Sequence, residues 1–176
     1  MDTTINTVRV LIFERRPRLA IGIAKILEKS KLISVIGRLD NPQKLEEVIE
    51  ALSPDVLVID ADHSGCPVGE VCSYLKRKYE IGIVLLSTEG GPVHEALGAG
   101  ADSIVSRPFH PRDLVLAVVH AARGAESANS MAALPEIEKR MKADKDLMTG
   151  KLAPLIDWAS RSQVEEVSPR LKPKAS

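Results

Sequence analysis

Charged and hydroxyl side chains stand directly after the short apolar segments of this sequence. Five of them have types that suit chemistry: Glu14, Arg15, Asp60, Ser87 and Arg107. A carboxylate among hydroxyls and cations can accept a phosphoryl group, bind an anion together with the cations, or join a neutral cluster of ion pairs. Two carboxylates held close together repel each other, so Glu14 and Asp60 need a cation, a shared proton or basic neighbours. Arg15 and Arg107 are the basic neighbours that this sequence supplies.

Apolar segments alternate with segments of helical period between residues 8 and 124. The segments predicted as strands are 8–13, 32–37, 55–59, 81–86 and 103–106. The segments predicted as helices are 17–29, 42–52, 68–78, 92–99 and 111–123. This alternation predicts right-handed crossovers and one parallel sheet with helices on both faces. Functional groups of such sheets collect at the carboxyl ends of the strands, so we expect the five side chains to meet there, together with Asp62 and Thr88.

Composition excludes several classes of protein. Lys plus Arg equals Asp plus Glu at 24 each, so no global positive charge points to nucleic acid, and five aromatic residues are too few for a base-stacking surface. The two cysteines supply neither a disulfide framework nor a zinc site. No window approaches the ~18 apolar residues of a membrane span, and no signal-peptide pattern opens the chain. We therefore expect a cytoplasmic protein without membrane contact.

Several stretches in order resemble one known family, the receiver domain of bacterial two-component response regulators. The stretch 54–60 (PDVLVID) is similar to the strand that delivers the phosphoacceptor aspartate, here Asp60, and Gly65 stands at the usual glycine behind it. The stretches 96–102 (ALGAGAD) and 107–109 (RPF) resemble later receiver motifs. The resemblance covers residues 8–124 and implies a flavodoxin-like fold, with five strands doubly wound by five helices.

The expected magnesium site departs from the family pattern. Receivers place two acids after the first strand, whereas this chain has Glu14 followed by Arg15. Glu14, Asp60 and the main-chain carbonyl of Asp62 are the ligands that a magnesium ion would find here. A positive charge ~4 Å away costs the ion about 4 kcal/mol at an effective dielectric constant of ~20. We therefore expect no bound cofactor, and we expect Arg15 to act as a built-in cation.

The switch residues are partly retained. Ser87 keeps the family's switch hydroxyl, and Thr88 takes the next, normally small, position. Arg107 replaces the lysine that pairs with the phosphoryl group, and its planar fork has a different reach. Ile104 replaces the switch aromatic of the fifth strand, so the usual rotamer switch is missing.

Two interpretations of function follow from these features. The first is an atypical receiver that signals through protein–protein contacts with little or no magnesium-dependent phosphorylation. The alternative is a conventional response regulator, phosphorylated on Asp60 by a histidine kinase and controlling transcription through a partner. We expect no enzyme activity, because a flavodoxin-like cofactor enzyme would need a glycine-rich phosphate loop where residues 14–18 read ERRPR.

The helix 111–123 is apolar almost all round, and a sheet can cover only one side of it. We therefore predict an interaction face on this helix and the fifth strand, made of Ile104, Leu114, Val115, Val118 and Val119. Its expected partners are a histidine kinase or output protein and a second copy of the chain, and we do not expect direct nucleic-acid binding. Residues 125–176 are predicted as a linker and a helical extension that assists the homodimer and ends in a mobile basic tail.

Overall fold

The computed structural model describes residues 7–88 and 97–124 of the chain. Five parallel strands form one sheet in the order β2-β1-β3-β4-β5, which confirms the predicted flavodoxin-like architecture. The strands are β1 (Val8–Phe13), β2 (Ile33–Leu39), β3 (Val56–Asp60), β4 (Gly82–Thr88) and β5 (Ser103–Arg107). The strand β4 is two residues longer than expected at its end, so Ser87 and Thr88 lie in the strand itself.

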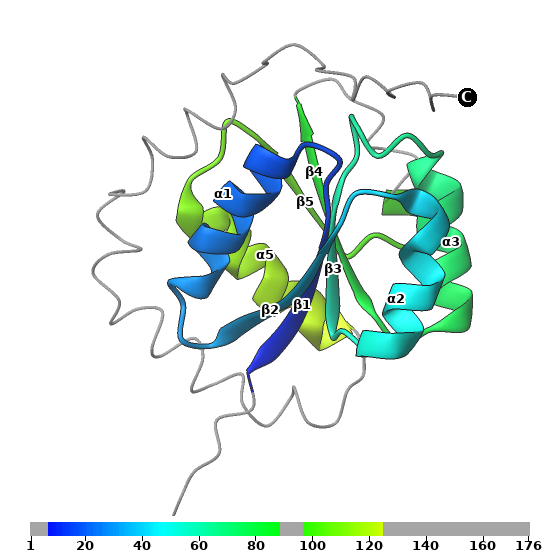
Figure 1. Cartoon of the computed structure of the whole chain (residues 1–176), viewed down its shortest axis with the longest axis horizontal. Helices are drawn as coiled ribbons and strands as arrows, with labels where there is room; N and C mark the ends of the chain where they lie inside the picture. Colours follow the sequence, from blue (N-terminus) through cyan, green and yellow to red (C-terminus); the bar gives the residue numbers. More distant parts are fainter. Residues whose placement is uncertain (1–6, 89–96, 125–176) are drawn as a thin grey trace, which may run out of the picture.

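Helices cover both faces of the sheet, as Figure 1 shows. One face carries α1 (Pro17–Glu28) and α5 (Pro111–Gly124), and the other carries α2 (Leu45–Leu52) and α3 (Val68–Lys78). Of the helix predicted at 92–99, Leu97 and Gly98 are helical and Ala99 lies in a turn, and the rest lies outside the described residues. The predicted extension 125–176 also lies outside them. Within the described ranges, no helix combines the length and the apolar character that crossing a membrane requires.

Alternate residues of the central strands pack into two separate cores. In β1, Val10 and Ile12 belong to the core under α1 and α5, whereas Leu11 and Phe13 belong to the core under α2 and α3. All four side chains are fully buried, as expected for a strand in the middle of a parallel sheet. The two cores fix the sheet from both sides and hold the carboxyl ends of its strands in place.

The start of the second helical segment follows its capping signal. The side-chain oxygen of Asn41 accepts a hydrogen bond from the backbone N–H of Gln43 at 2.9 Å, as an N-cap does. Pro42 opens a short 3-10 turn, η1 (Pro42–Lys44), before α2 begins at Leu45. The helix α2 ends at Leu52, and the residue that caps it, Ser53, adopts a left-handed conformation with φ of 46°.

The predicted interaction face on α5 is wrong for four of its five residues. Leu114, Val115, Val118 and Val119 are buried in the core with α1 and the sheet. The prediction allowed for cover by the sheet alone, but α1 packs beside α5 and covers a second side of it. Ile104 is half-buried and packs against the other core. On α5 the large apolar side chain that stays accessible is Leu116, at 40% exposure.

The helix α5 packs closely against the start of β4, and a larger residue at this contact should destabilise the fold. A Cβ built on Gly82 would lie 2.6 Å from the carbonyl carbon of Ala121, and neither piece of backbone can move freely. We expect Gly82→Ala to lower the free energy of unfolding by about 1–3 kcal/mol, the usual cost of overpacking, as measured by urea titration.

Gly98→Ala is the matched control, because a Cβ at Gly98 meets no atom of the described residues within 4 Å. Alanine is the better helix former, so this variant should be neutral or more stable by up to ~1 kcal/mol. Equal effects of the two substitutions would contradict the packing of α5 against β4.

Candidate functional site

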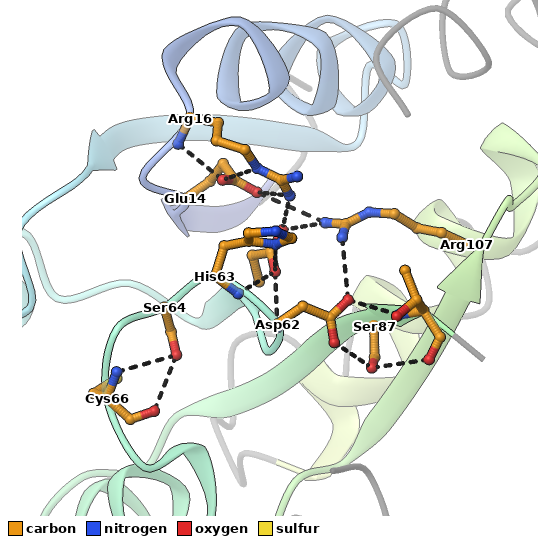
Figure 2. A network of polar contacts seen from close by, with 10 residues as sticks. Glu14, Arg16, Asp62, His63, Ser64, Cys66, Ser87 and Arg107 are labelled. Atoms are coloured by element: carbon orange, nitrogen blue, oxygen red, sulfur yellow. Dashed lines mark hydrogen bonds and ion pairs between the residues drawn. The ribbon is translucent and has the colours of Figure 1, made fainter. Parts of the chain in front are cut away.

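Polar side chains meet at the carboxyl edge of the sheet, where four neighbouring strands end (Figure 2). Glu14 directly follows β1, and Asp60 is the last residue of β3. Ser87 and Thr88 end β4, and Arg107 ends β5. The strand order therefore brings together residues that stand up to 93 positions apart in the chain, and Asp62 joins them from the loop after β3.

Arg16 bridges the two buried carboxylates of the cluster. Its backbone N–H and its Nε donate to Glu14 Oε1 at 2.9 and 3.0 Å, and its Nη2 donates to Glu14 Oε2 at 3.2 Å. The same Nη2 donates to Asp60 Oδ2. Both carboxylate side chains are fully buried, so a cation between them offsets a repulsion that water cannot screen.

The prediction that Arg15 supplies this charge is wrong. Arg15 is exposed, and its guanidinium lies over Gly65, where an added Cβ would be 2.6 Å from its Nη1. Arg16 is the N-cap of α1 in an extended conformation, with φ −92° and ψ 107°, and its side chain points toward the strand ends instead. The sequence alone does not show which of the two adjacent arginines enters the pocket, because the turn from β1 into α1 decides it.

Arg107 is the second cation of the cluster, and its side chain is 6% exposed. Its Nη2 donates to Asp60 Oδ2 and lies 3.7 Å from Glu14 Oε2, while its Nη1 lies 3.6 Å from Asp62 Oδ2. Its Nε is buried without an acceptor among the residues that the structure describes. Buried charges persist when they are paired, and here the charges of Arg16 and Arg107 match those of Glu14 and Asp60.

The other oxygen of Asp60 is bound by the following turn. Asp60 Oδ1 accepts from the backbone N–H of Asp62 at 2.9 Å and from that of His63 at 3.0 Å. The His63 Nδ1 lies 3.3 Å away. His63 was not among the predicted pocket residues, although an aspartate that begins a turn commonly accepts from backbone groups two residues on. Both carboxylate oxygens of Asp60 are therefore engaged.

The carboxylate of Asp62 connects the loop after β3 to the end of β4. The Ser87 hydroxyl donates to Asp62 Oδ1 at 2.9 Å, and the Thr88 backbone N–H donates to Asp62 Oδ2 at 2.7 Å. Ser87 is fully buried, whereas the Asp62 side chain is 13% exposed. The expectation for Asp62 was a main-chain ligand, and in this structure its side chain makes the contacts within the pocket.

Comparison with known proteins assigns this arrangement to a family. The family model described as the response regulator receiver domain matches residues 10–119. The chain belongs to the receiver-domain family. The nitrate/nitrite response regulator NarL of Escherichia coli (strain K12) is 27% identical over 139 residues, which cover 77% of this chain and 64% of NarL. The DNA-binding response regulator MtrA of Mycolicibacterium smegmatis is 30% identical over 155 residues, which cover 86% of this chain and 66% of MtrA. The match thus covers slightly less than two thirds of each of these relatives.

Solved receiver domains have the same fold as this chain. The signal receiver domain of NarL from Mycobacterium tuberculosis superposes with a TM-score of 0.60 and 28% identity, covering 68% of this chain and 98% of that domain. The isolated receiver domain of RcsB from Salmonella enterica serovar Typhimurium gives a TM-score of 0.56 and 25% identity, covering 62% of this chain and 83% of that chain.

The pocket of this receiver does not fit the magnesium ion that the family resemblance implies. Mg²⁺ requires oxygen ligands at 2.0–2.1 Å in near-octahedral geometry. Both oxygens of Glu14 and one of Asp60 instead accept hydrogen bonds from the Arg16 guanidinium. One ligand atom each from Asp60, Asp62 and His63 lie within 4.8 Å of one another, but that carboxylate pair is already bound by N–H and hydroxyl donors. We therefore derive no step of this receiver through a metal ion.

The two buried carboxylates of the receiver have pKa values shifted in opposite directions. Burial raises the pKa of Glu14 to about 7, and the adjacent Asp60 carboxylate adds to the shift. Burial alone would raise the pKa of Asp60 too, but the hydrogen bond from Glu14 and the charges of Arg107 and Arg16 lower it below its usual range. Asp60 therefore stays ionised at neutral pH, while Glu14 is the carboxyl group of the pair that binds a proton first.

The raised pKa of Glu14 predicts a pH-dependent stability. Between pH 4.5 and about 7 the folded chain holds a proton on Glu14 that the unfolded chain has released, so stability falls as the pH rises through this range. Glu14→Gln removes this titration. We expect the free energy of unfolding of the wild type to drop by about 1–3 kcal/mol relative to Glu14→Gln between pH 4.5 and 7.5.

Urea titrations of both proteins at several pH values measure this difference. Asp60 stays ionised over this pH range, and the titrations of the remaining shared groups cancel in the comparison. Parallel stability curves for the two proteins would show that the Glu14 carboxyl group titrates at its ordinary pKa.

Proposed function

We propose that this receiver domain is an atypical one, which signals through protein–protein contacts with little or no magnesium-dependent phosphorylation. The observation that carries the proposal is the Arg16 guanidinium between Glu14 and Asp60. Its positive charge pairs with both carboxylates and offsets their repulsion, as a bound cation would, and the chain itself supplies this charge.

The contacts of Asp60 oppose a role as phosphoacceptor. A carboxylate that attacks phosphorus needs an oxygen free of strong donors, yet Asp60 Oδ2 faces two guanidinium groups and Oδ1 accepts two backbone N–H groups. Arg107 and Asp60 are both buried, and breaking such a buried pair costs about 3–5 kcal/mol. Each 1.36 kcal/mol is a factor of ten in rate, so losing one such pair slows transfer about 100-fold or more.

The pairing of charges supports a pocket with one stable arrangement. Arg16 and Arg107 pair with Glu14 and Asp60 without an external ion when both acids are ionised, and Asp62 is a third carboxylate at the edge of the pocket. A ligand shifts a two-state equilibrium only through a difference in its affinity for the two states. With its cation supplied by the chain, the domain presents one surface to its partners regardless of the magnesium concentration.

The partners in this proposal are proteins. We infer a histidine kinase or an output protein, together with a second copy of the chain, and no enzyme activity of the domain itself. The names of the two relatives describe a nitrate/nitrite response regulator and a DNA-binding response regulator. The balanced charge of this chain does not favour a DNA surface of its own, so we propose that effects on transcription pass through a partner.

Labelling with acetyl phosphate and Mg²⁺, read by intact mass, tests the proposal. We expect the wild type to gain no phosphoryl group. The double variant Arg15→Asp/Arg16→Ala restores the acid pair of the family and removes the bridging guanidinium, and we expect it to bind Mg²⁺ and to gain one phosphoryl group.

The Asp60→Asn variant is the control for the labelled position, both alone and in the double variant. A mass gain in the wild type that Asp60→Asn abolishes would overturn the proposal and establish the conventional phosphoacceptor. Circular dichroism of every variant checks that the fold is intact.

Sedimentation of the full chain tests the proposed homodimer. Because Leu116 is the accessible apolar side chain of α5, we expect Leu116→Asp to shift the dimer to a monomer by placing a charge in the contact. Tyr74→Ser on α3, a position 42% exposed, is the matched control and should leave the dimer intact. A wild type that sediments as a monomer would contradict this part of the proposal.

A further inference from the structure

Two hydrogen-bond donors and one guanidinium ion-pair partner converge on the Asp62 carboxylate. They are the Ser87 hydroxyl at 2.9 Å, the Thr88 backbone N–H at 2.7 Å and the Arg107 guanidinium, whose Nη1 lies 3.6 Å from Oδ2. Figure 2 shows Asp62 reaching from the loop after β3 toward the ends of the neighbouring strands. This carboxylate takes part in none of the contacts between Arg16 and the Glu14–Asp60 pair.

The three donors form a set that suits an oxyanion. Hydroxyl, backbone N–H and guanidinium groups are the usual ligands of carboxylate, phosphate and sulfate oxygens in proteins. The edge of a sheet fixes their positions, because Ser87 and Thr88 belong to β4 and Arg107 ends β5. Such donors need no rearrangement to receive an anion.

The proton of Ser87 is directed by Asp62. The hydroxyl has one proton and two acceptors in reach, Asp62 Oδ1 at 2.9 Å and its neighbour's carbonyl, Thr88 O, at 3.2 Å. The shorter, charge-assisted bond to the carboxylate is the stronger one. Ser87 is fully buried, so water does not compete for the bond.

We propose that Asp62 is an internal ligand of an oxyanion site formed by Ser87, Thr88 and Arg107, and that it keeps the site closed to free phosphate and sulfate. This inference rests on the proposed function, since it describes how the same pocket is held in one state. The side chain occupies the donors from within the chain and ties the loop after β3 to the end of β4. Shortening it opens a site for an external oxyanion of two negative charges.

Isothermal titration calorimetry of the full chain with inorganic phosphate, without Mg²⁺, tests the inference. We expect Asp62→Ala to bind phosphate at least tenfold more tightly than the wild type. We expect Asp62→Ala/Ser87→Ala to lose most of that gain, because the buried hydroxyl donor is gone.

Asp55→Ala is the matched control, because the carboxylate of Asp55 also accepts a backbone N–H, that of Arg9 at 2.8 Å, but just before β3 instead of at its carboxyl end. It should leave phosphate affinity unchanged. If Asp62→Ala does not fold, Asp62→Asn keeps the size of the side chain and removes its charge, and a smaller gain is expected. No gain in a folded Asp62 variant, or an equal gain in Asp55→Ala, would overturn the inference.

The outcomes separate this inference from the proposed function. Labelling of the wild type by acetyl phosphate overturns the proposed function, whereas the calorimetry contains neither Mg²⁺ nor a phosphoryl donor. A receiver that resists labelling and whose Asp62 variants gain no phosphate affinity would retain the proposed function and lose this inference alone.

Discussion

The pocket depends on the pairing of two buried carboxylates with two arginines. Glu14 and Asp60 are fully buried, and moving an isolated carboxylate from water into a protein interior costs several kcal/mol or more. Arg16 and Arg107 offset that cost through hydrogen bonds as well as charge. Because guanidinium donors are fixed in a plane, they also determine where each carboxylate oxygen can point. The second oxygen of Asp60 holds the loop after β3, and Asp62 ties that loop to the end of β4.

The sheet provides the distances that the pairing requires. Adjacent parallel strands lie about 4.8 Å apart, so residues at the same level of β1, β3, β4 and β5 come within reach of long side chains. The central strands are anchored by apolar residues on both faces, which leaves their carboxyl ends as the polar edge. The paired charges of the pocket are therefore held by a rigid sheet, and this fold is shared with the receivers of known structure.

The sequence predicted most of the fold because its signals are local. Alternating apolar runs located the strands, the Asn41 cap located the start of a helix, and strand ends named Glu14, Asp60, Ser87 and Arg107 as neighbours. The errors concern choices that depend on three-dimensional packing. The turn into α1 selects Arg16 over Arg15, and the contact between α1 and α5 buries the face predicted to bind partners. Residue spacing and composition indicate neither the position of Arg16 nor the burial of this face of α5.

The bridge made by Arg16 also restricts how this sequence can change. A substitution at Arg16 alone removes one of the two arginines that pair with the buried Glu14 and Asp60, so the product is less stable than its parent. A substitution at Arg15 alone leaves the bridge in place, since Arg15 lies over Gly65. A path of single steps from this pocket to a metal-binding one therefore includes a step that weakens the pairing of Glu14 and Asp60 unless an external cation replaces the guanidinium. Once the arginine bridge has formed, selection for stability therefore acts against its loss and against a return to a metal-binding pocket.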